Sequence, residues 1–126
     1  MKHAAEQDPL THRIIGAAMR VHSDLGPGLL ESVYQNALCV ELQEQGMRFR
    51  AEQPVDVIYR GRHVGHLYAD IIVEGRVILE LKSVENLAPI HSAQLITYLK
   101  ATGLRTGLLI NFNVRHLRDG IKRVAN

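Results

Sequence analysis

The order of elements expected between residues 77 and 111 constrains the fold more than any other feature of the chain. Residues 77–84, VILELKSV, form an apolar run typical of a buried strand, and a helix is expected over residues 90–102, ending at Gly103. The run TGLLIN, residues 106–111, is short and continuously apolar, like a central strand. A strand, a helix of this length and a second strand predict a right-handed βαβ crossover with two parallel strands.

A three-stranded antiparallel meander is expected to include the first strand of this crossover. Alternating apolar and polar residues predict a strand over residues 55–59, and another is expected from about residue 63 to residue 73. The turns RGR (60–62) and EGR (74–76) separate these strands from each other and from residues 77–84.

Two helices are expected before the sheet. Thr11 is the expected N-cap of the first, in which Ile14, Ala17, Ala18, Val21 and Leu25 recur at helical spacing. LGPG (25–28) ends that helix, and the second is expected over residues 29–45, with Gly46 as its stop. The residues expected to face inward on the second helix are Leu30, Val33, Ala37, Leu38 and Leu42. After residue 111, the tail VRHLRDGIKRV is expected to hold a short helix and an edge strand.

The chain therefore predicts one α/β domain, residues 11–126, with a mixed central sheet flanked by helices, after a flexible N-terminal arm of residues 1–10. The single cysteine, Cys39, excludes an internal disulfide and a cysteine-ligated zinc or iron–sulfur site within one chain, and favours a reducing, cytoplasmic compartment. No apolar run approaches the roughly 20 residues of a membrane span. A net charge of +2 permits a nucleic-acid partner without requiring one.

Two charged residues interrupt the apolar run at residues 77–84. Because side chains on a strand alternate, Glu80 and Lys82 point to the same face as Ile78, and Leu81 points to the other. They are either surface residues on a solvated face or members of a site. The apolar surroundings and the crossover that follows favour a central strand, where charges are costly unless they are paired or bind a metal.

Asp70 supplies a third charge, in the apolar run LYADIIV. If the intervening turn has three residues, Val73 pairs with Val77, and Asp70 lies opposite Glu80 with both carboxylates on one face. A two-residue turn would instead place Asp70 opposite Leu79. Two carboxylates, a backbone carbonyl and water suit Mg²⁺ or Mn²⁺, and an adjacent lysine can activate water or offset charge at a phosphate.

Asp70, followed at hairpin distance by Glu80-Leu81-Lys82, resembles the signature of the PD-(D/E)XK nuclease superfamily. The resemblance covers residues 14–124 and implies a restriction-endonuclease-like core. Two features of the superfamily are missing: Ala69 stands where the proline of the name would precede Asp70, and the RecB-type cysteine cluster is absent.

Two further motifs agree with this resemblance. Gln94 and Tyr98, in QLITY, resemble the QxxxY motif of the RecB-type branch. Gly28, Glu31 and Tyr34, in GLLESVY, resemble the signature of the GxxExxY family of small proteins, which is placed in the same superfamily.

The resemblance implies a role for each matching residue. The implied ligands of a Mg²⁺ or Mn²⁺ ion are Asp70, Glu80, the Leu81 carbonyl and Glu31. Lys82 would be the catalytic lysine beside Asp70 and Glu80. The residues implied to line the site and contact substrate are Gln94, Tyr98 and Tyr34. The implied substrate is nucleic acid, and we expect DNA.

Each of these residues also has a structural interpretation. Glu31 suits the first turn of a helix as a solvated carboxylate, because its negative charge interacts favourably with the positive N-terminal end of the helix dipole. Tyr34 and Tyr98 are equally typical of packing residues with satisfied hydroxyls, and Gln94 of a plain surface residue. Gly28 is also a residue that permits a turn.

The remaining candidates are expected to be structural. His63 and His66, three apart on a strand, are expected to face opposite ways, and Cys39 is expected to be a small core residue. Basic residues gather near the C-terminus, where they either follow a phosphate backbone or form a solvated face: Arg105, Arg115, Arg118, Lys122 and Arg123.

Two functions from different classes follow. The first is a divalent-metal-dependent nuclease that hydrolyses phosphodiester bonds. The second is a non-catalytic nucleic-acid-binding or partner-binding domain on the same scaffold. The complete set of Asp70, Glu80 and Lys82 favours the nuclease, and the small size of the chain leaves a homodimer or a protein partner as the source of further contact surface.

Overall fold

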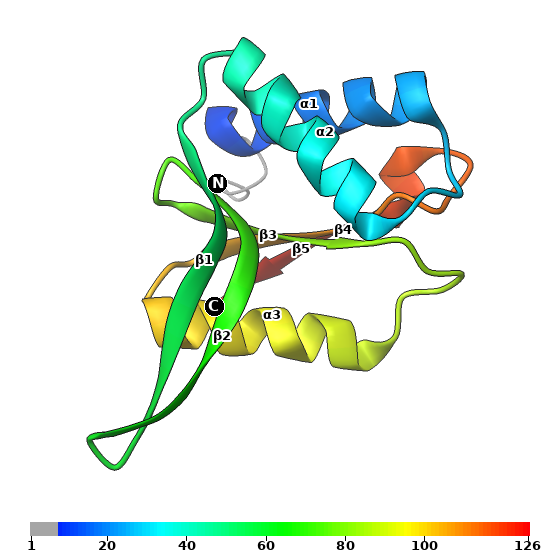
Figure 1. Cartoon of the computed structure of the whole chain (residues 1–126). Helices are drawn as coiled ribbons and strands as arrows, with labels where there is room; N and C mark the ends of the chain where they lie inside the picture. The colour runs from blue at the N-terminus through cyan, green and yellow to red at the C-terminus, as the bar shows by residue number, and fades with distance from the viewer. Residues whose placement is uncertain (1–7) are drawn as a thin grey trace.

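A computed structural model describes residues 8–126 and shows a five-stranded mixed sheet with helices on both faces (Figure 1). The elements in chain order are α1 (Pro9–Leu25), α2 (Glu31–Glu44), β1 (Phe49–Tyr59), β2 (Arg62–Val73), β3 (Val77–Lys82), α3 (Pro89–Thr102), β4 (Thr106–Asn111), the 3₁₀ helix η1 (Leu117–Gly120) and β5 (Ile121–Ala125). Residues 1–7, most of the predicted N-terminal arm, lie outside the described residues.

The strands follow each other in the sheet in sequence order, β1-β2-β3-β4-β5. Only β3 and β4 are parallel, and α3 connects them, so the predicted meander and βαβ crossover are both confirmed. The predicted short helix and edge strand of the tail are η1 and β5. Val73 pairs with Val77, which confirms the three-residue turn.

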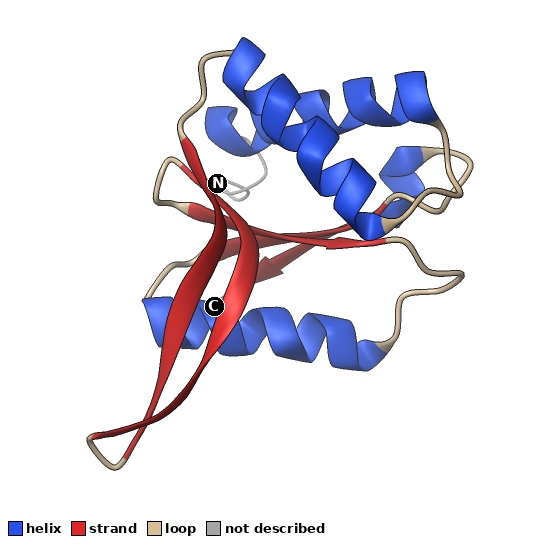
Figure 2. Ribbon diagram, viewed as in Figure 1, coloured by secondary structure: helices blue, strands red, loops and turns tan. Residues whose placement is uncertain are grey.

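The two faces of the sheet carry separate apolar cores, and helices cover both faces (Figure 2). Helices α1 and α2 cover one face, where Leu79 and Leu81 of β3 are buried. Helix α3 covers the other face and packs on Ile78. Gly107 lets α3 approach closely, because a Cβ at this position would lie 2.9 Å from the side chain of Leu95. None of the helices in residues 8–126 combines the length and apolar character that a bilayer span requires.

The first helix begins earlier than predicted. Asp8, not Thr11, is its N-cap: the Asp8 side chain accepts a hydrogen bond from the Leu10 N–H, and Pro9 stands in the first turn, where its missing N–H is harmless. Thr11 is buried inside the helix and its hydroxyl donates to Asp8 Oδ2.

The second helix also differs in its start and its inward face. It begins at Glu31, because Leu30 has an extended backbone and is 72% exposed as the N-cap. Val33 is exposed too, so the predicted inward positions of both residues are wrong. The buried face consists of Tyr34, Leu38 and Leu42, at i, i+4 and i+8.

Cys39 lies beside this face and packs against the core beneath α1 and α2. It is partly buried, and burial raises the pKa of its thiol above the ordinary value, with the charge of Glu52 adding to the effect. A thiol with a raised pKa has little thiolate character, which agrees with its expected packing role.

Strand β1 begins six residues earlier than predicted, at Phe49, and includes Pro54. It is an edge strand, where a proline without an N–H is tolerated. The β1–β2 hairpin extends well beyond the rest of the molecule (Figure 1).

The two strands of this hairpin change register near its tip. Val57 pairs with Gly65 but Ile58 pairs with His63, so β2 contains one extra residue there. The extra residue brings the rings of His63 and His66 together, with centroids 6.3 Å apart. The prediction that these two histidines face opposite ways is therefore wrong.

Candidate active site

The candidate site lies where β2 and β3 separate. Their paired residues end at Ile71 and Leu79, one residue short of Asp70 and Glu80. Beyond that point the side chains accept the backbone hydrogen bonds: the Asp70 N–H donates to Glu80 Oε2 (3.3 Å), and the Leu81 N–H donates to Asp70 Oδ2 (2.8 Å). The two carboxylates thus take the place of ladder acceptors, which holds them close together at the fork.

Burial strongly affects both carboxylates. Glu80 is only 8% exposed, and burial raises its pKa to about 8, helped by the negative charge of Asp70. Burial also raises the pKa of Asp70, although its bond from the Leu81 N–H acts in the opposite direction. Lys82 lowers both pKa values. A bound cation would favour the ionised form of both groups, since opposite charge offsets the cost of burial.

Lys82 and Glu31 lie within electrostatic range of this pair. The charge of Glu31, an exposed residue at the start of α2, raises the pKa of both Asp70 and Glu80. Among residues 8–126 the half-buried Lys82 side chain has no hydrogen-bond or ion-pair partner. The Ser83 hydroxyl donates to the Leu29 carbonyl (2.6 Å), which ties the end of β3 to the start of α2.

Tyr34 is fully buried and holds the loop before α2. Its hydroxyl donates to the Gly26 carbonyl and accepts from the Leu29 N–H, and its ring stacks on Phe112 with centroids 4.5 Å apart. These contacts match the packing interpretation of Tyr34. Tyr34 therefore positions the Gly26–Leu30 loop, from which Glu31 starts, and does not itself face the fork.

Gln94 and Tyr98 lie on α3, on the face of the sheet to which Glu80 points. Tyr98 is partly buried, and its hydroxyl donates to the Tyr68 carbonyl (3.3 Å). Burial, followed by the charges of Glu80 and Asp70, raises the pKa of Tyr98 to about 12. The Gln94 side chain is exposed one turn earlier.

Sequence reasoning missed Gln35 and Glu52, which adjoin the carboxylate pair. Gln35 Nε2 donates to Glu52 Oε2 (2.7 Å) and to the Asp70 carbonyl (3.4 Å). Glu52 has a positive φ of 51°, unusual for a glutamate, and its charge raises the pKa of Asp70. Gln35 could have been found as the residue one turn after Glu31. Glu52 could not, because it becomes the neighbour of Asp70 only once β1 begins at Phe49.

Asn111, at the end of β4, was also missed. It is buried, and its side-chain amide accepts from the Val84 N–H and donates to the Val84 carbonyl. The Phe112 N–H donates to the Lys82 carbonyl (2.9 Å). These bonds fix the backbone on both sides of Ser83, and so help to position the end of the strand that carries Lys82.

The carboxylate pair suits a small divalent cation. Within residues 8–126, Asp70 Oδ1 and Glu80 Oε1 are not engaged in hydrogen bonds, so each carboxylate retains one oxygen for a ligand. The same residues contain no group of three or more His, Cys, Asp or Glu side chains placed to hold a metal. The protein would thus supply two carboxylates, with a backbone carbonyl and water as further ligands, a set typical of Mg²⁺ and Mn²⁺.

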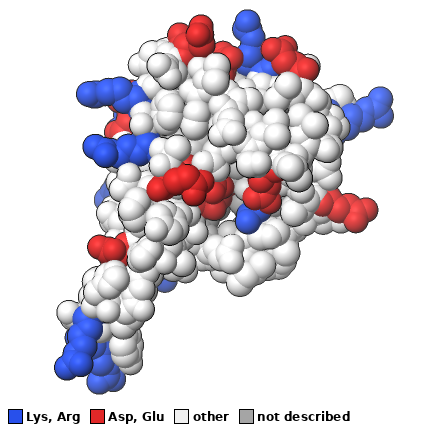
Figure 3. All heavy atoms as spheres, viewed as in Figure 1, with Lys and Arg blue, Asp and Glu red and all other residues white. Residues whose placement is uncertain are grey.

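Acidic and basic side chains gather in different places on the surface. Acidic side chains gather across the middle of the face in Figure 3, around a basic one, where β1 and β2 pass below α2. Basic side chains gather instead at the end of the β1–β2 hairpin (Figure 3).

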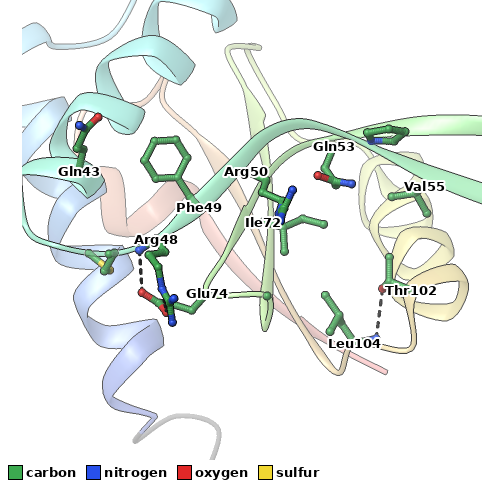
Figure 4. Close-up of a pocket in the computed structure, with 13 residues that line it drawn as sticks. Gln43, Arg48, Phe49, Arg50, Gln53, Val55, Ile72, Glu74, Thr102 and Leu104 are labelled. Carbon is green, nitrogen blue, oxygen red and sulfur yellow. Dashed lines mark hydrogen bonds and ion pairs between the residues drawn. The ribbon is translucent and has the colours of Figure 1, made fainter.

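A separate groove, of about 960 Å³, lies at the start of β1 (Figure 4). Its lining includes Arg48 and Glu74, which form an ion pair at 3.6 Å, and Thr102 and Leu104 at the end of α3. None of Asp70, Glu80 or Lys82 lines it. The chemistry of the fork, and not the size of this groove, therefore identifies the candidate site.

Residues 8–124 match the family model of the PD-(D/E)XK nuclease superfamily. The chain belongs to this superfamily. Its single domain, with a mixed five-stranded sheet between helices, has the α/β restriction-endonuclease-like fold, as the sequence resemblance implied. No curated protein and no solved structure matches the chain significantly.

Proposed function

We propose that this member of the PD-(D/E)XK superfamily is a divalent-metal-dependent nuclease that hydrolyses phosphodiester bonds in nucleic acid, with DNA as its substrate. The observation that carries the proposal is the fork between β2 and β3, where Asp70 and Glu80 share backbone hydrogen bonds and Glu80 has a pKa of about 8. We assign the chain to the GxxExxY family and the RecB-type QxxxY branch on its own motifs, and to the cytoplasm on its single cysteine.

Asp70 and Glu80 would hold Mg²⁺ or Mn²⁺, with the Leu81 carbonyl as a further ligand and Glu31 as an outer ligand that acts through water. When bound, the cation supplies Lewis-acid polarisation of the phosphate and offsets its charge. Lys82, which extends from the same strand as Glu80, orients the attacking water and stabilises the charge that develops on the phosphate oxygens.

Two residues of α3 complete the proposed site. The hydroxyl of Tyr98 is a neutral hydrogen-bond donor close to the carboxylates, and it donates to the Tyr68 carbonyl. Gln94 is exposed one turn away on the same face of α3, where it can contact substrate.

The test is cleavage of labelled single- and double-stranded DNA and RNA in Mg²⁺, Mn²⁺ or EDTA. Glu80→Gln and Lys82→Ala remove the proposed chemistry, and Glu44→Gln and Lys100→Ala are matched controls at exposed positions. Metal-dependent cleavage that is lost in the first pair and retained in the second would support the nuclease. Cleavage that survives Glu80→Gln and Lys82→Ala would place the activity elsewhere. Binding without cleavage on any substrate would favour the non-catalytic binding domain.

A further inference from the structure

The outer part of the β1–β2 hairpin, residues 53–69, is an arm that projects from the rest of the molecule and precedes Asp70 along β2 (Figures 1 and 2). In the described chain β2 pairs with β3 only from Ile71 to Val73, and the rest of β2 pairs with β1 alone. Four large apolar side chains of the arm are more than half exposed: Ile58, Tyr59, Val64 and Tyr68. The arm is therefore built from the same strand that carries Asp70, and of its residues only Val55 and Ala69, at its base, lie in a core, the one under α3.

The tip of the arm carries two arginines. Arg60 and Gly61 form a two-residue turn in which both have positive φ, 51° and 76°, a conformation that favours Asn-Gly over Arg-Gly. The guanidinium of Arg60 lies 5.5 Å from the centre of the Tyr59 ring, and Arg62 follows as an exposed residue. Arg60 thus adopts a backbone conformation that arginine disfavours. Basic side chains are exposed at the tip of the arm (Figure 3).

A row of rings runs from this tip toward the carboxylates. His66 and Tyr68 share one face of β2, opposite to Ala69, which lies in the core under α3, and Asp70 follows Tyr68 two residues later. The ring of His66 contacts Tyr68 edge-on with centroids 5.1 Å apart, and the register shift brings His63 beside His66. The row covers roughly 23 Å of strand between His63 and Asp70.

The backbone of the row contacts α3 beside the site. The hydroxyl of Tyr98 donates to the carbonyl of Tyr68, and the charges of Glu80 and Asp70 both act on Tyr98. Asp56 is the one acidic residue among residues 53–69, and its Oδ1 lies 3.2 Å from His63 Nε2. Because Arg60 and Arg62 outnumber it, the arm has a net positive charge.

We propose that this face of the β1–β2 hairpin binds a single-stranded nucleic acid and directs it to the carboxylate pair. Arginines match the charge of phosphates, and exposed rings stack with unpaired bases without reading their sequence. A duplex would present its bases already stacked and could use only the arginines. The inference rests on the proposed nuclease function for its direction toward Asp70 and Glu80, but the binding itself does not depend on cleavage.

The test is fluorescence anisotropy of the full chain with a labelled single-stranded DNA and the duplex of the same sequence, in EDTA so that cleavage does not intervene. One variant is Arg60→Asn with Arg62→Gln, which suits the turn because asparagine accepts a positive φ. The second is His66→Ala with Tyr68→Ala. The matched control is Arg13→Gln with Arg20→Gln, two exposed arginines on α1, away from the arm (Figure 1). Thermal unfolding of each variant verifies the fold.

We expect each arm variant to weaken single-strand binding about tenfold, the worth of one stacked base or a few phosphate contacts, and the control to bind like the wild type. Unchanged binding in both arm variants, an equal loss in the control, or no binding by the wild type would overturn the inference. Tighter binding of the duplex would overturn the preference for a single strand. A change in oligomeric state with unchanged DNA binding would assign the arm to a second copy of the chain. Binding through the arm without cleavage in Mg²⁺ would support this inference and contradict the proposed nuclease function.

Discussion

Residues 71–73 of β2 are buried between β1 and β3, whereas residues 62–68 of the same strand pair with β1 alone and are mostly exposed. Asp70 lies between the two parts. The inner part follows the alternation of a central strand, with Ile71 in one core and Ile72 in the other. The outer part has no core to join. The candidate site forms where the pairing of β2 with β3 ends, because backbone N–H groups there donate to carboxylates instead of to a neighbouring strand.

This contrast should be clearest in stability. Leu79 is fully buried opposite Ile71, so we expect Leu79→Ala to lower the free energy of unfolding by about 2–5 kcal/mol through lost burial and the cavity it leaves. Val64→Ala, on the arm, should change it by no more than about 0.5 kcal/mol. Urea denaturation followed by circular dichroism measures both. Similar losses for the two variants would mean that the arm is part of the folding unit.

Protonation of Glu80 should make the fork sensitive to pH. Its pKa rises from 4.5 to about 8 on folding, so the folded state binds more protons between these values and stability is lost as pH rises through this window. We expect a loss on the order of 3 kcal/mol between pH 5 and pH 8, measured by urea denaturation in EDTA. Glu80→Gln should flatten the dependence, and Glu44→Gln should not. A wild-type profile as flat as that of Glu80→Gln would contradict a raised pKa for the buried Glu80 carboxyl.

Asn111 offers a way to disturb the fork without touching its charges. Asn111→Ala leaves the Val84 N–H and carbonyl without their partner, and we expect it to lower the free energy of unfolding by about 1–3 kcal/mol. It should also lower kcat more than it raises KM, because it loosens the end of β3 beside Lys82. Asn113→Ala, a half-buried asparagine on the same loop, is the control. A normal kcat in Asn111→Ala would show that Lys82 needs no support from β4.

The smallest effect on stability is expected at the tip of the arm. Arg60→Asn replaces a residue with a positive φ by one that tolerates it, so the free energy of unfolding should stay the same or rise by a few tenths of a kcal/mol, on the order of other turn optimisations. Thermal unfolding is the measurement. A clear loss of stability would show that the Arg60–Tyr59 contact supports the hairpin.

Much of this fold could be predicted because its local signals agree with its tertiary structure. The run at residues 77–84 and the three-residue turn before it led to the correct pairing of Val73 with Val77 and to the proximity of Asp70 and Glu80. The errors arose where tertiary context decides. Leu30 is apolar but caps α2 in solvent, and no local pattern shows the extra residue that brings His63 beside His66.

The missed residues of the site have the same explanation. Glu52 and Gln35 lie near Asp70 only because α2 packs beside β1. Asn111 binds the backbone of Val84, which lies 27 residues earlier in the sequence. Contacts of this kind depend on the register and crossing of whole elements. Tyr34 illustrates the reverse case, since its motif was visible in the sequence but its buried position, stacked on Phe112, was not.

The most direct test of the fork is calorimetric titration of Mn²⁺ at pH 8 into the wild type, Asp70→Asn and Glu44→Gln. Asparagine at position 70 retains an oxygen for the Leu81 N–H, so the strands should stay in place while the charge is lost. We expect the wild type and Glu44→Gln to bind one Mn²⁺ per chain, and Asp70→Asn to bind about tenfold more weakly or not at all. Equal affinity in the wild type and Asp70→Asn would contradict the assignment of the metal site to the point where β2 and β3 separate.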